Sequence, residues 1–295
     1  MDGGLKKEYR GVKITAHIFM IVFTVLAVLP FLMLISSSIT SNESLATHGA
    51  NFFPRVFDFE AYGYIAKSWD VIGRSYIITI FTTLVGTVAS LLISTMLAYG
   101  LAWHKTPGRR IIKFMIVFAL LFNGGAVSSY IVYTQLFNMT NSILAYIVPN
   151  LLMNGFTVIL YINYFKNVIP SSLMEAAQID GANMFTIYHK IFIPLSLPII
   201  ATMGMSTLIV YWNDWNNGLY YISELDKYSV QLLLTKLQED VNNLASMTGY
   251  DKDASLPTES LRMAIAVIGI LPMLLIYPFF QKYFAGGIAL GGVKE

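Results

Sequence analysis

Residues that could support catalysis or bind a metal are few and far apart in this sequence. There is no cysteine, and the four histidines are scattered without the spacing of a metal site. The sequence also lacks the G-x-x-x-x-G-K-[ST] phosphate loop, the H-E-x-x-H motif and the G-x-S-x-G motif. We therefore predict no catalytic residue, no metal site and no cofactor held by this chain. Any energy-driven process that it serves must draw energy from a partner. The histidines are His17, His48, His104 and His189.

One segment near the middle combines charged, small and proline residues at regular spacing. Residues 169–198 read IPSSLMEAAQIDGANMFTIYHKIFIPLSLP. Pro170 should stop the preceding helix, and Ser172 with Glu175 three residues later is a capping box that should begin another. Gly181 should end the helix that begins at this capping box, because glycine adopts positive φ at little cost.

The same segment predicts two short helices joined by the glycine turn, followed by a shaped entry into a further helix. The first should place Leu173, Ala176 and Ala177 on one face, and the second Phe185, Tyr188 and Phe192 on one side. Pro194 and Pro198 should then shape the entry into the next long helix. The small alanine patch would let another backbone approach closely.

This segment resembles the EAA motif of permeases from ATP-driven, binding-protein-dependent (ABC) importers. That motif has E-A-A, two residues, D-G-A and a proline-rich exit. In the family this element is a cytoplasmic coupling helix that inserts into a cleft of the ATP-binding subunit. The resemblance assigns this role to residues 175–182. Local roles are an alternative, because Glu175 and Asp180 also suit helix caps and Gly181 a helix end; both readings can hold together. The matching positions are Glu175, Ala176, Ala177, Asp180, Gly181, Ala182, Ile191, Pro194 and Pro198.

Softer features extend the resemblance over nearly the whole chain. The stretches 122–125 (FNGG), 211–213 (YWN) and 286–292 (GGIALGG) are similar to the oligosaccharide branch of these permeases, near the group for complex or polysaccharide-derived sugars. The resemblance implies a bacterial cytoplasmic membrane protein that pairs with a second, homologous permease as a heterodimer. It also implies two ATP-binding subunits that hold ATP and Mg, a soluble solute-binding protein outside, and no nucleic-acid partner.

A path for a sugar needs hydrogen-bonding groups and aromatic faces. Uncharged polar and aromatic residues in or beside the apolar segments are therefore the candidates. Each also has a plainer explanation, because polar residues in spans often join helices and aromatic rings often mark the membrane interface. The candidates are Asn123, Asn154, Tyr161, Tyr211, Trp212, Asn213 and Trp215.

The elements that must position these residues are membrane-spanning helices. Hydrophobic residues make up 56% of the chain and charged residues 12%, about half the usual share for a soluble domain. The apolar residues fall in runs near the roughly 20 residues that a spanning helix needs, far longer than barrel strands. We predict an all-α, polytopic protein with six transmembrane helices. The spans are about 14–35, 75–102, 111–122, 142–164, 191–211 and 263–280.

The loops and ends follow from these spans. Residues 1–13 form an N-terminal tail, and 14–295 the permease domain, with the coupling helix at about 171–190 and a large, acid-rich outer loop at about 212–262. The third span is interrupted by Asn123-Gly124-Gly125. It either ends there and is followed by a short outer-surface helix, or continues as one kinked span.

The distribution of charge sets the orientation. With both termini inside, the inner segments hold twelve Lys and Arg residues and five acids, and the outer ones seven and twelve. Lys and Arg favour cytoplasmic loops, so we place both termini in the cytoplasm. The middle of every predicted span is free of Asp, Glu, Lys and Arg, which argues against an ion-coupled secondary carrier, the main alternative function. A membrane scaffold without transport is the other alternative.

Overall fold

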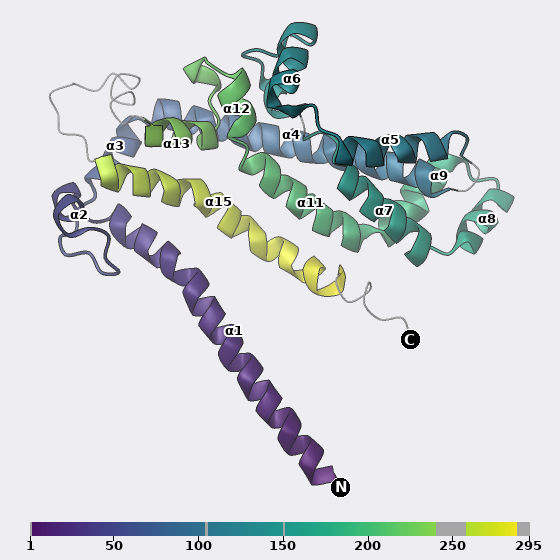
Figure 1. Ribbon diagram of the computed structural model, residues 1–295, viewed down its shortest axis with the longest axis horizontal. Helices are drawn as coiled ribbons and strands as arrows, with labels where there is room; N and C mark the ends of the chain where they lie inside the picture. Colours follow the sequence, from purple (N-terminus) through teal and green to yellow (C-terminus); the bar gives the residue numbers. More distant parts are fainter. Residues whose placement is uncertain (1, 104–105, 150, 240–257, 288–295) are drawn as a thin grey trace. The chain divides into compact units, whose positions relative to one another are not determined.

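The computed structural model describes residues 2–103, 106–149, 151–239 and 258–287. These residues form helices and no named strand; a single bridge joins Thr40 to Phe57. They divide into two compact units, one built from residues 1–70 and 236–271 and the other from residues 71–235 and 272–295. The all-α prediction is confirmed (Figure 1).

The first unit is built around the N-terminal helix α1, Asp2–Ser38. From Val12 to Ile35 the apolar side chains of α1 are exposed apart from the half-buried Leu29, Met33 and Leu34, and Ser36–Ser38 at its end are buried. The Oγ of Ser38 hydrogen-bonds the hydroxyl of Tyr62 at 2.8 Å. A long helix that is apolar all round and unburied requires lipid or another protein around it. The unit also contains α2 (Asn42–His48), α3 (Glu60–Lys67) and the start of α15 (Thr258–Gly287).

The longest helix of the second unit, α4 (Trp69–Ala102), turns its polar side chains inward. Hydroxyl residues spaced along one side are buried, while apolar residues on the other side are exposed, among them Ile77, Phe81 and Leu84. The Oγ1 of Thr79 accepts a hydrogen bond from the backbone N–H of Val230 at 2.9 Å. Polar and small residues commonly join helices in membranes, where apolar side chains can face lipid. The buried hydroxyl residues are Ser75, Thr79, Thr82, Thr83, Thr87, Ser90, Ser94 and Thr95.

The next apolar segment is broken at Asn123-Gly124-Gly125, which fits both alternatives for the third span. Helix α5 (Arg109–Leu121) ends at Phe122, and the following pair, α6 (Gly125–Ile131) and the π-helix η1 (Val132–Leu136), is bent from it by 118°. The Oδ1 of Asn123 accepts the N–H of Gly125 at 2.8 Å. Gly125 has φ of 83°, so glycine is needed to begin the new direction.

The predicted fourth helix over 142–164 is wrong in its first half. Helix α7 spans Gly155–Val168 and is preceded by the 3₁₀ turn η2 (Ile143–Tyr146) and by irregular chain. Pro149 disfavours helix in the residue before it. Distant side chains also bind the carbonyls of this segment, which are therefore not available for a helix.

The predicted fifth helix over 191–211 is helical but broken at Ser196, and its long part begins at Leu197. Helix α9 (Met184–Ile187), the π-helix η3 (Tyr188–Phe192) and α10 (Ile193–Leu195) form one element, which is bent by 81° from α11 (Leu197–Trp212). Pro194 and Pro198 lie in the first turns of α10 and α11, on either side of the bend. Their predicted shaping of this entry is confirmed, because proline suits a first turn and disrupts a helix interior.

Three shorter elements follow α11. They are α12 (Asn216–Tyr221), the 3₁₀ turn η4 (Leu225–Lys227) and α13 (Val230–Glu239). Part of the predicted outer loop, residues 240–257, lies outside the described residues. Within the described part of the chain, three helices are long and apolar enough to cross a membrane, and each of the two bent pairs could provide one more span. Helix α7, with 14 residues, is shorter than the roughly 20 residues that a spanning helix needs.

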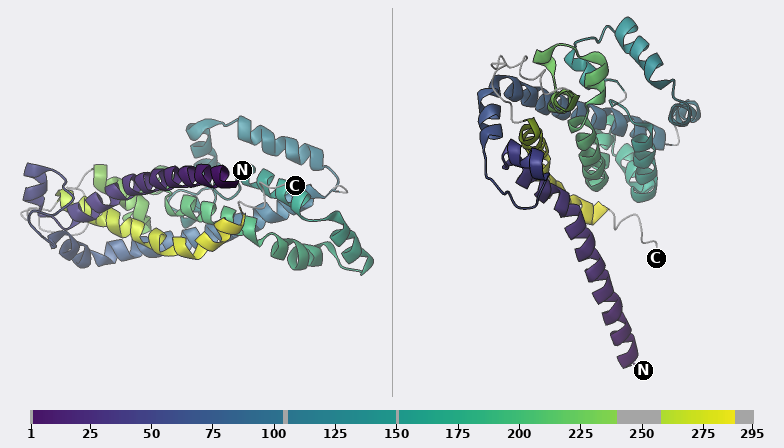
Figure 2. Two further views of the ribbon diagram at one scale, coloured as in Figure 1. Left: turned by 90° about the horizontal axis from the view of Figure 1, so that it is seen from below. Right: turned by 60° about the vertical axis from the view of Figure 1, so that its left-hand side comes forward.

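The core of the second unit joins α4, α5, α7 and the α9–η3 element. Its fully buried members include Ala98 of α4, Tyr161 of α7 and Ile187 of α9. Helix α4 also meets α11 closely, because a Cβ at Gly86 would lie 2.4 Å from the Tyr211 ring. Helix α8 (Ser171–Ile179) forms the tip of one end of this unit (Figures 1 and 2).

Candidate functional site

The turn that ends α8 is a double hydrogen-bonded Schellman turn. The N–H of Ala182 donates to the carbonyl of Ala177 at 2.9 Å, and the N–H of Gly181 to that of Gln178 at 3.0 Å. Gly181 has φ of 78°, in the left-handed region that this motif requires. The predicted glycine break is confirmed. The D-G-A triplet therefore fixes the direction in which the chain leaves α8.

The start of α8 differs from the prediction. The helix begins at Ser171 with Pro170 at its N-cap and without a side-chain cap. Ser172 therefore lies within the first turn, where its side chain cannot cap, so the predicted capping box does not form. The role of Pro170 is confirmed, since α7 ends at Val168 and Ile169 is extended. Asn183, rather than Asp180, caps the next helix through a 2.8 Å bond from the N–H of Thr186.

The outer face of this tip is apolar and exposed. Ile179 is 86% exposed and Phe185 67%, and Leu173 and Ala176 are exposed beside them. Ala177 packs against the core instead, with Met174 and Ala182. Leu173, Ala176 and Ala177 share one side of α8 by their spacing, as predicted, but Ala177 lies at the edge that packs against the core while the other two are exposed. Glu175, Asp180 and Gly181 are also exposed.

The inner face of the same segment is held by buried aromatic residues. Tyr188 and Phe192 are buried, the latter 1% exposed, and the Tyr188 hydroxyl hydrogen-bonds the Oγ1 of Thr95 on α4 at 2.8 Å. The ring of Phe192 lies 4.6 Å from Tyr99 and 5.3 Å from Phe165, measured between centroids. Phe185 does not share their buried side. Motion of the tip is therefore linked to α4 and α7 by tight packing.

A cavity of about 400 Å³ opens between the tip and the helices behind it. Its walls are mainly apolar, and Lys166 and Glu175 bring the charged groups. The carboxylate of the EAA motif thus lines a hollow between α8 and the end of α7. The other lining residues are Ala102, Trp103, Phe165, Asn167, Val168, Ile169, Pro170, Ser171, Met174 and Phe192.

The residues predicted for a sugar path divide into three groups. Asn123 forms a turn and Asn154 caps α7 by accepting the N–H groups of Phe156 and Thr157. Tyr161 lies in the core, away from the others. The remaining four lie together at the end of α11, where Tyr211 and Trp212 are buried and Asn213 and Trp215 are exposed. Their role in binding a sugar stays a prediction.

The end of α11 also holds a buried carboxylate that the sequence reasoning missed. The Oδ1 of Asp214 accepts the N–H of Asn217 at 3.0 Å, while its Oδ2 is buried and has no hydrogen-bond partner among the described residues. The Nδ2 of Asn217 donates to the carbonyl of Pro149, and the Tyr211 hydroxyl to that of Ile147. These two bonds attach the irregular segment before α7 to the α11–α12 corner. The run of polar and aromatic residues YWNDWNN, residues 211–217, is the sequence signal that marks this corner.

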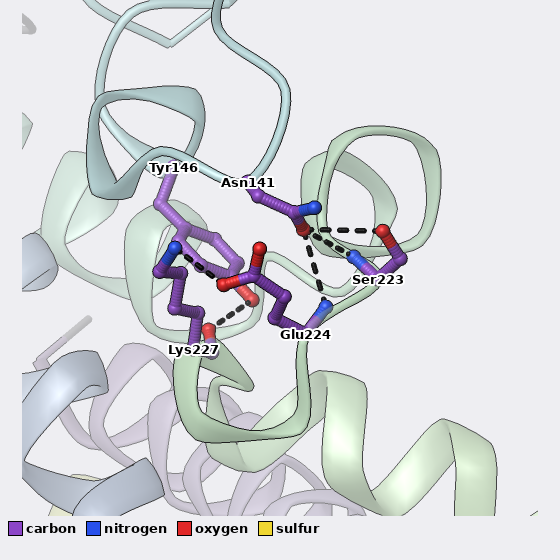
Figure 3. A network of polar contacts seen from close by, with 5 residues as sticks. All are labelled: Asn141, Tyr146, Ser223, Glu224 and Lys227. Carbon is purple, nitrogen blue, oxygen red and sulfur yellow. Dashed lines mark hydrogen bonds and ion pairs between the residues drawn. The ribbon is translucent and has the colours of Figure 1, made fainter.

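A second polar network joins the same two regions further along the chain (Figure 3). The Oδ1 of Asn141 accepts the N–H groups of Ser223 and Glu224 at 2.7 and 3.1 Å and lies 3.2 Å from the Ser223 hydroxyl. The Tyr146 hydroxyl donates to the carbonyl of Lys227 at 3.1 Å. Asn141 has φ of 53°, a conformation that asparagine tolerates better than most residues. These contacts hold the chain after α12 in a defined place.

Replacing Asp214 by asparagine should stabilise the protein at neutral pH. Burial raises the pKa of Asp214 to about 6, while hydrogen bonds from Asn217 oppose the rise. Because the folded pKa exceeds the unfolded one, stability from this group is present at low pH and is lost as the pH rises through about 6. The shift corresponds to up to about 3 kcal/mol at pH 7.5. Asparagine retains the oxygen that accepts from Asn217.

Thermal melts of the detergent-purified protein between pH 5 and 7.5 check this prediction. The Asp214→Asn variant should melt several degrees above the wild type at pH 7.5, and the difference should shrink as the pH falls. A variant that melts below the wild type at every pH would show that the hydrogen bonds of the carboxylate outweigh the cost of its burial.

The described helices include three that are long and apolar enough to cross a membrane, and a family comparison identifies the class of protein. Residues 90–289 match the family described as "Binding-protein-dependent transport system inner membrane component". The match covers more than half of the chain, and the chain belongs to this family. It is therefore a non-catalytic membrane subunit of a transport system, as the resemblance predicted. Membership implies ATPase and binding-protein partners and a second permease.

Similar proteins agree with the predicted branch. The chain is similar to the polygalacturonan/rhamnogalacturonan transport system permease protein YtcP of Bacillus subtilis (strain 168), at 36% identity over 94% of this chain and 96% of the relative. It is also similar to the arabinooligosaccharides transport system permease protein AraQ of the same organism, at 26% identity over 96% of both. Among solved structures, it resembles a chain of a bacterial ABC transporter involved in the import of the acidic polysaccharide alginate. The TM-score is 0.78 at 30% identity, over 93% of this chain and 97% of that one.

Proposed function

We propose that this chain is the membrane-spanning permease subunit of an ATP-driven importer for an oligosaccharide released from a polysaccharide. The observation that carries the proposal is the construction of the α8 tip. Its outer face exposes Ile179 and Phe185, while its inner face is packed onto α4 and α7 through Tyr188 and Phe192. An exposed apolar face backed by a rigid core is suited to receive force from a docked partner.

In this proposal the residues Glu175–Ala182 couple the chain to a separate ATP-binding subunit. The partner's cleft would cover the exposed face, and its closure would move the tip as a unit, because the Gly181 turn fixes the direction of the chain. Movement of Tyr188 and Phe192 would then displace α4 and α7. The 81° bend between α10 and α11 places a joint directly after this segment. ATP and Mg belong to the partner.

The proposed arrangement in the membrane keeps six spans with both termini in the cytoplasm. The charge asymmetry of the loops supports this orientation, and the exposed α1 supports a lipid environment for the first span. We place α5 and the bent α6–η1 pair in the third span region, and α7 and α11 in the fourth and fifth. A second homologous permease, two ATP-binding subunits and a soluble binding protein complete the proposed assembly. The sugar would pass between the two permeases, with the residues at the end of α11 as its candidate contacts.

Co-purification tests the proposal directly. The tagged chain, expressed with its genomic neighbours and extracted in a mild detergent, should bring down a second permease and an ATPase that hydrolyses ATP. A chain that purifies alone, without ATPase activity, but takes up sugar in vesicles under an ion gradient would instead be a secondary carrier. The absence of charged residues from the middle of the predicted spans favours the first outcome.

A further inference from the structure

Two opposite charges from different helices line the cavity behind the α8 tip. Lys166 lies in the last turn of α7 and Glu175 in the middle of α8, and both border the hollow of about 400 Å³. Both residues are exposed. Within the part of the chain that the structure describes, neither takes part in an ion pair. The two charges therefore share one cavity without being paired across it.

The walls of this cavity differ in how firmly they are held. Phe165 and Phe192 are buried and pack edge to face, with ring centroids 5.3 Å apart. The opposite wall is one side of α8, where Ser171, Met174 and Glu175 lie together because they are three and four residues apart. Helix α8 contains no buried residue. The tip is therefore the wall that can move against a fixed core.

Movement of the tip toward that core would bring the two charges together. A break of two residues, the extended Ile169 and Pro170, joins α7 to α8 (Figure 1). Closing the cavity would remove its apolar walls from water, which favours closure. Because Glu175 lies on the moving wall and Lys166 on the fixed one, their separation would fall as the space closes. Their attraction would also grow as water leaves.

The charges of this cavity favour closure over a charged ligand of its own. An anion that entered would meet the carboxylate of Glu175, and a cation would meet the ammonium group of Lys166. The pair is instead complementary to itself. Lys166 also suits its place at the end of α7, because a cation in the last turn interacts favourably with the helix dipole.

We propose that Lys166 is a positioning residue for the coupling segment, which pairs with Glu175 when the tip closes the cavity. This rests on the proposed function, in which an ATP-binding subunit moves the tip. The pair would tie the end of α7 to α8 in the driven position and separate when the partner releases the tip. Glu175 would thus act inside this chain, on the side of α8 that borders the cavity.

Carbodiimide cross-linking measures the pairing on the native complex. The reagent condenses a lysine amine with a carboxylate in direct contact into an amide, taking up the water that is lost. The complex would be treated without nucleotide and after trapping with ATP and vanadate, and the peptide that joins Lys166 to Glu175 counted by mass spectrometry. Trapping should raise its yield on the order of fivefold, because nucleotide shifts the population toward the closed tip. The pair Lys227–Glu224, 2.6 Å apart, is the internal control and should link equally in both states.

Charge reversal tests whether the pairing serves transport. Lys166→Glu and Glu175→Lys should each lower ATP-driven uptake by the reconstituted complex on the order of tenfold, because like charges oppose closure. The double variant Lys166→Glu/Glu175→Lys should return uptake to within about threefold of the wild type, since it restores the attraction. Lys166→Arg should retain uptake. The matched control Lys67→Glu reverses a charge in the last turn of α3 and should leave uptake unchanged.

Equal yields of the linked peptide in the two states would overturn the proposal, as would single reversals without effect on uptake. Reversals that lower uptake without rescue in the double variant would also overturn it, in favour of a contact between Glu175 and a basic residue of the ATP-binding subunit. Uptake and ATPase co-purification are scored on the same wild-type preparation, so failure of the importer assignment would be seen separately. The cross-link would still decide the pairing in that case.

Discussion

Gly181→Val should lower ATP-driven uptake at least tenfold while leaving the amount of protein in the membrane unchanged. Gly181 has φ of 78° and no atom near the position of a Cβ, so the constraint is on the backbone and not on space. A β-branched residue in this region is strained by about 1–3 kcal/mol. The Schellman turn should open, and the tip would no longer leave α8 in the direction that a partner's cleft requires.

Two controls separate coupling from local strain. Gly181→Asn should retain most of the uptake, because asparagine tolerates the left-handed region. Gly49→Val places at least as much strain at the end of α2, where φ is 71°, ψ is −175° and space is again free, and should leave uptake intact. Uptake and ATPase activity would be measured on the reconstituted complex. Uptake in Gly181→Val within twofold of the wild type would refute a coupling role for this turn.

Phe192→Ala should destabilise the protein strongly, whereas Phe185→Ala should not. Phe192 is 1% exposed and packs between Tyr99 and Phe165, so its truncation leaves a cavity that costs about 3–5 kcal/mol. Phe185, seven residues earlier in the same segment, is 67% exposed. Its truncation removes only ring contacts with Tyr188 and His189, 6.4 and 6.5 Å away between centroids, among those that the structure describes, and should change the melting temperature by less than about 2 °C.

The two variants should differ again when the partner is present. Phe185→Ala should weaken retention of the ATPase subunit during purification, because its ring belongs to the face that the partner would cover. Phe192→Ala, assayed below its melting temperature, should retain the subunit but respond less to it, since the link to α4 and α7 is loosened. Melting curves and the ratio of ATPase to permease on a gel provide the readouts. Full ATPase retention by Phe185→Ala would remove Phe185 from the docking face.

The sequence by itself determined the features that depend only on composition and on the local backbone. Apolar runs were sufficient to predict an all-helical membrane protein, because a bilayer requires long helices whatever their neighbours. The helix stop at Pro170 and the turn at Gly181 were predicted correctly. The proline ring fixes φ and glycine lacks a Cβ, so each residue acts on its own segment of the backbone. The spacing of the EAA motif led to the family for the same reason, because the motif describes the geometry of one short segment.

Tertiary structure decided everything that depends on which side chains meet. The chain from Ser142 to Met153 looks as apolar as a span, yet the Tyr211 hydroxyl and the Asn217 amide bind its carbonyls and prevent a helix. The burial of Asp214 depends on such contacts, although the run YWNDWNN marks the corner in which it lies. The N-cap of α8 lies two residues before the predicted one, and the neighbouring helices decided which side of α8 is packed. Such features arise from contacts between segments far apart in the sequence, and their energies appear only when packing brings those segments together.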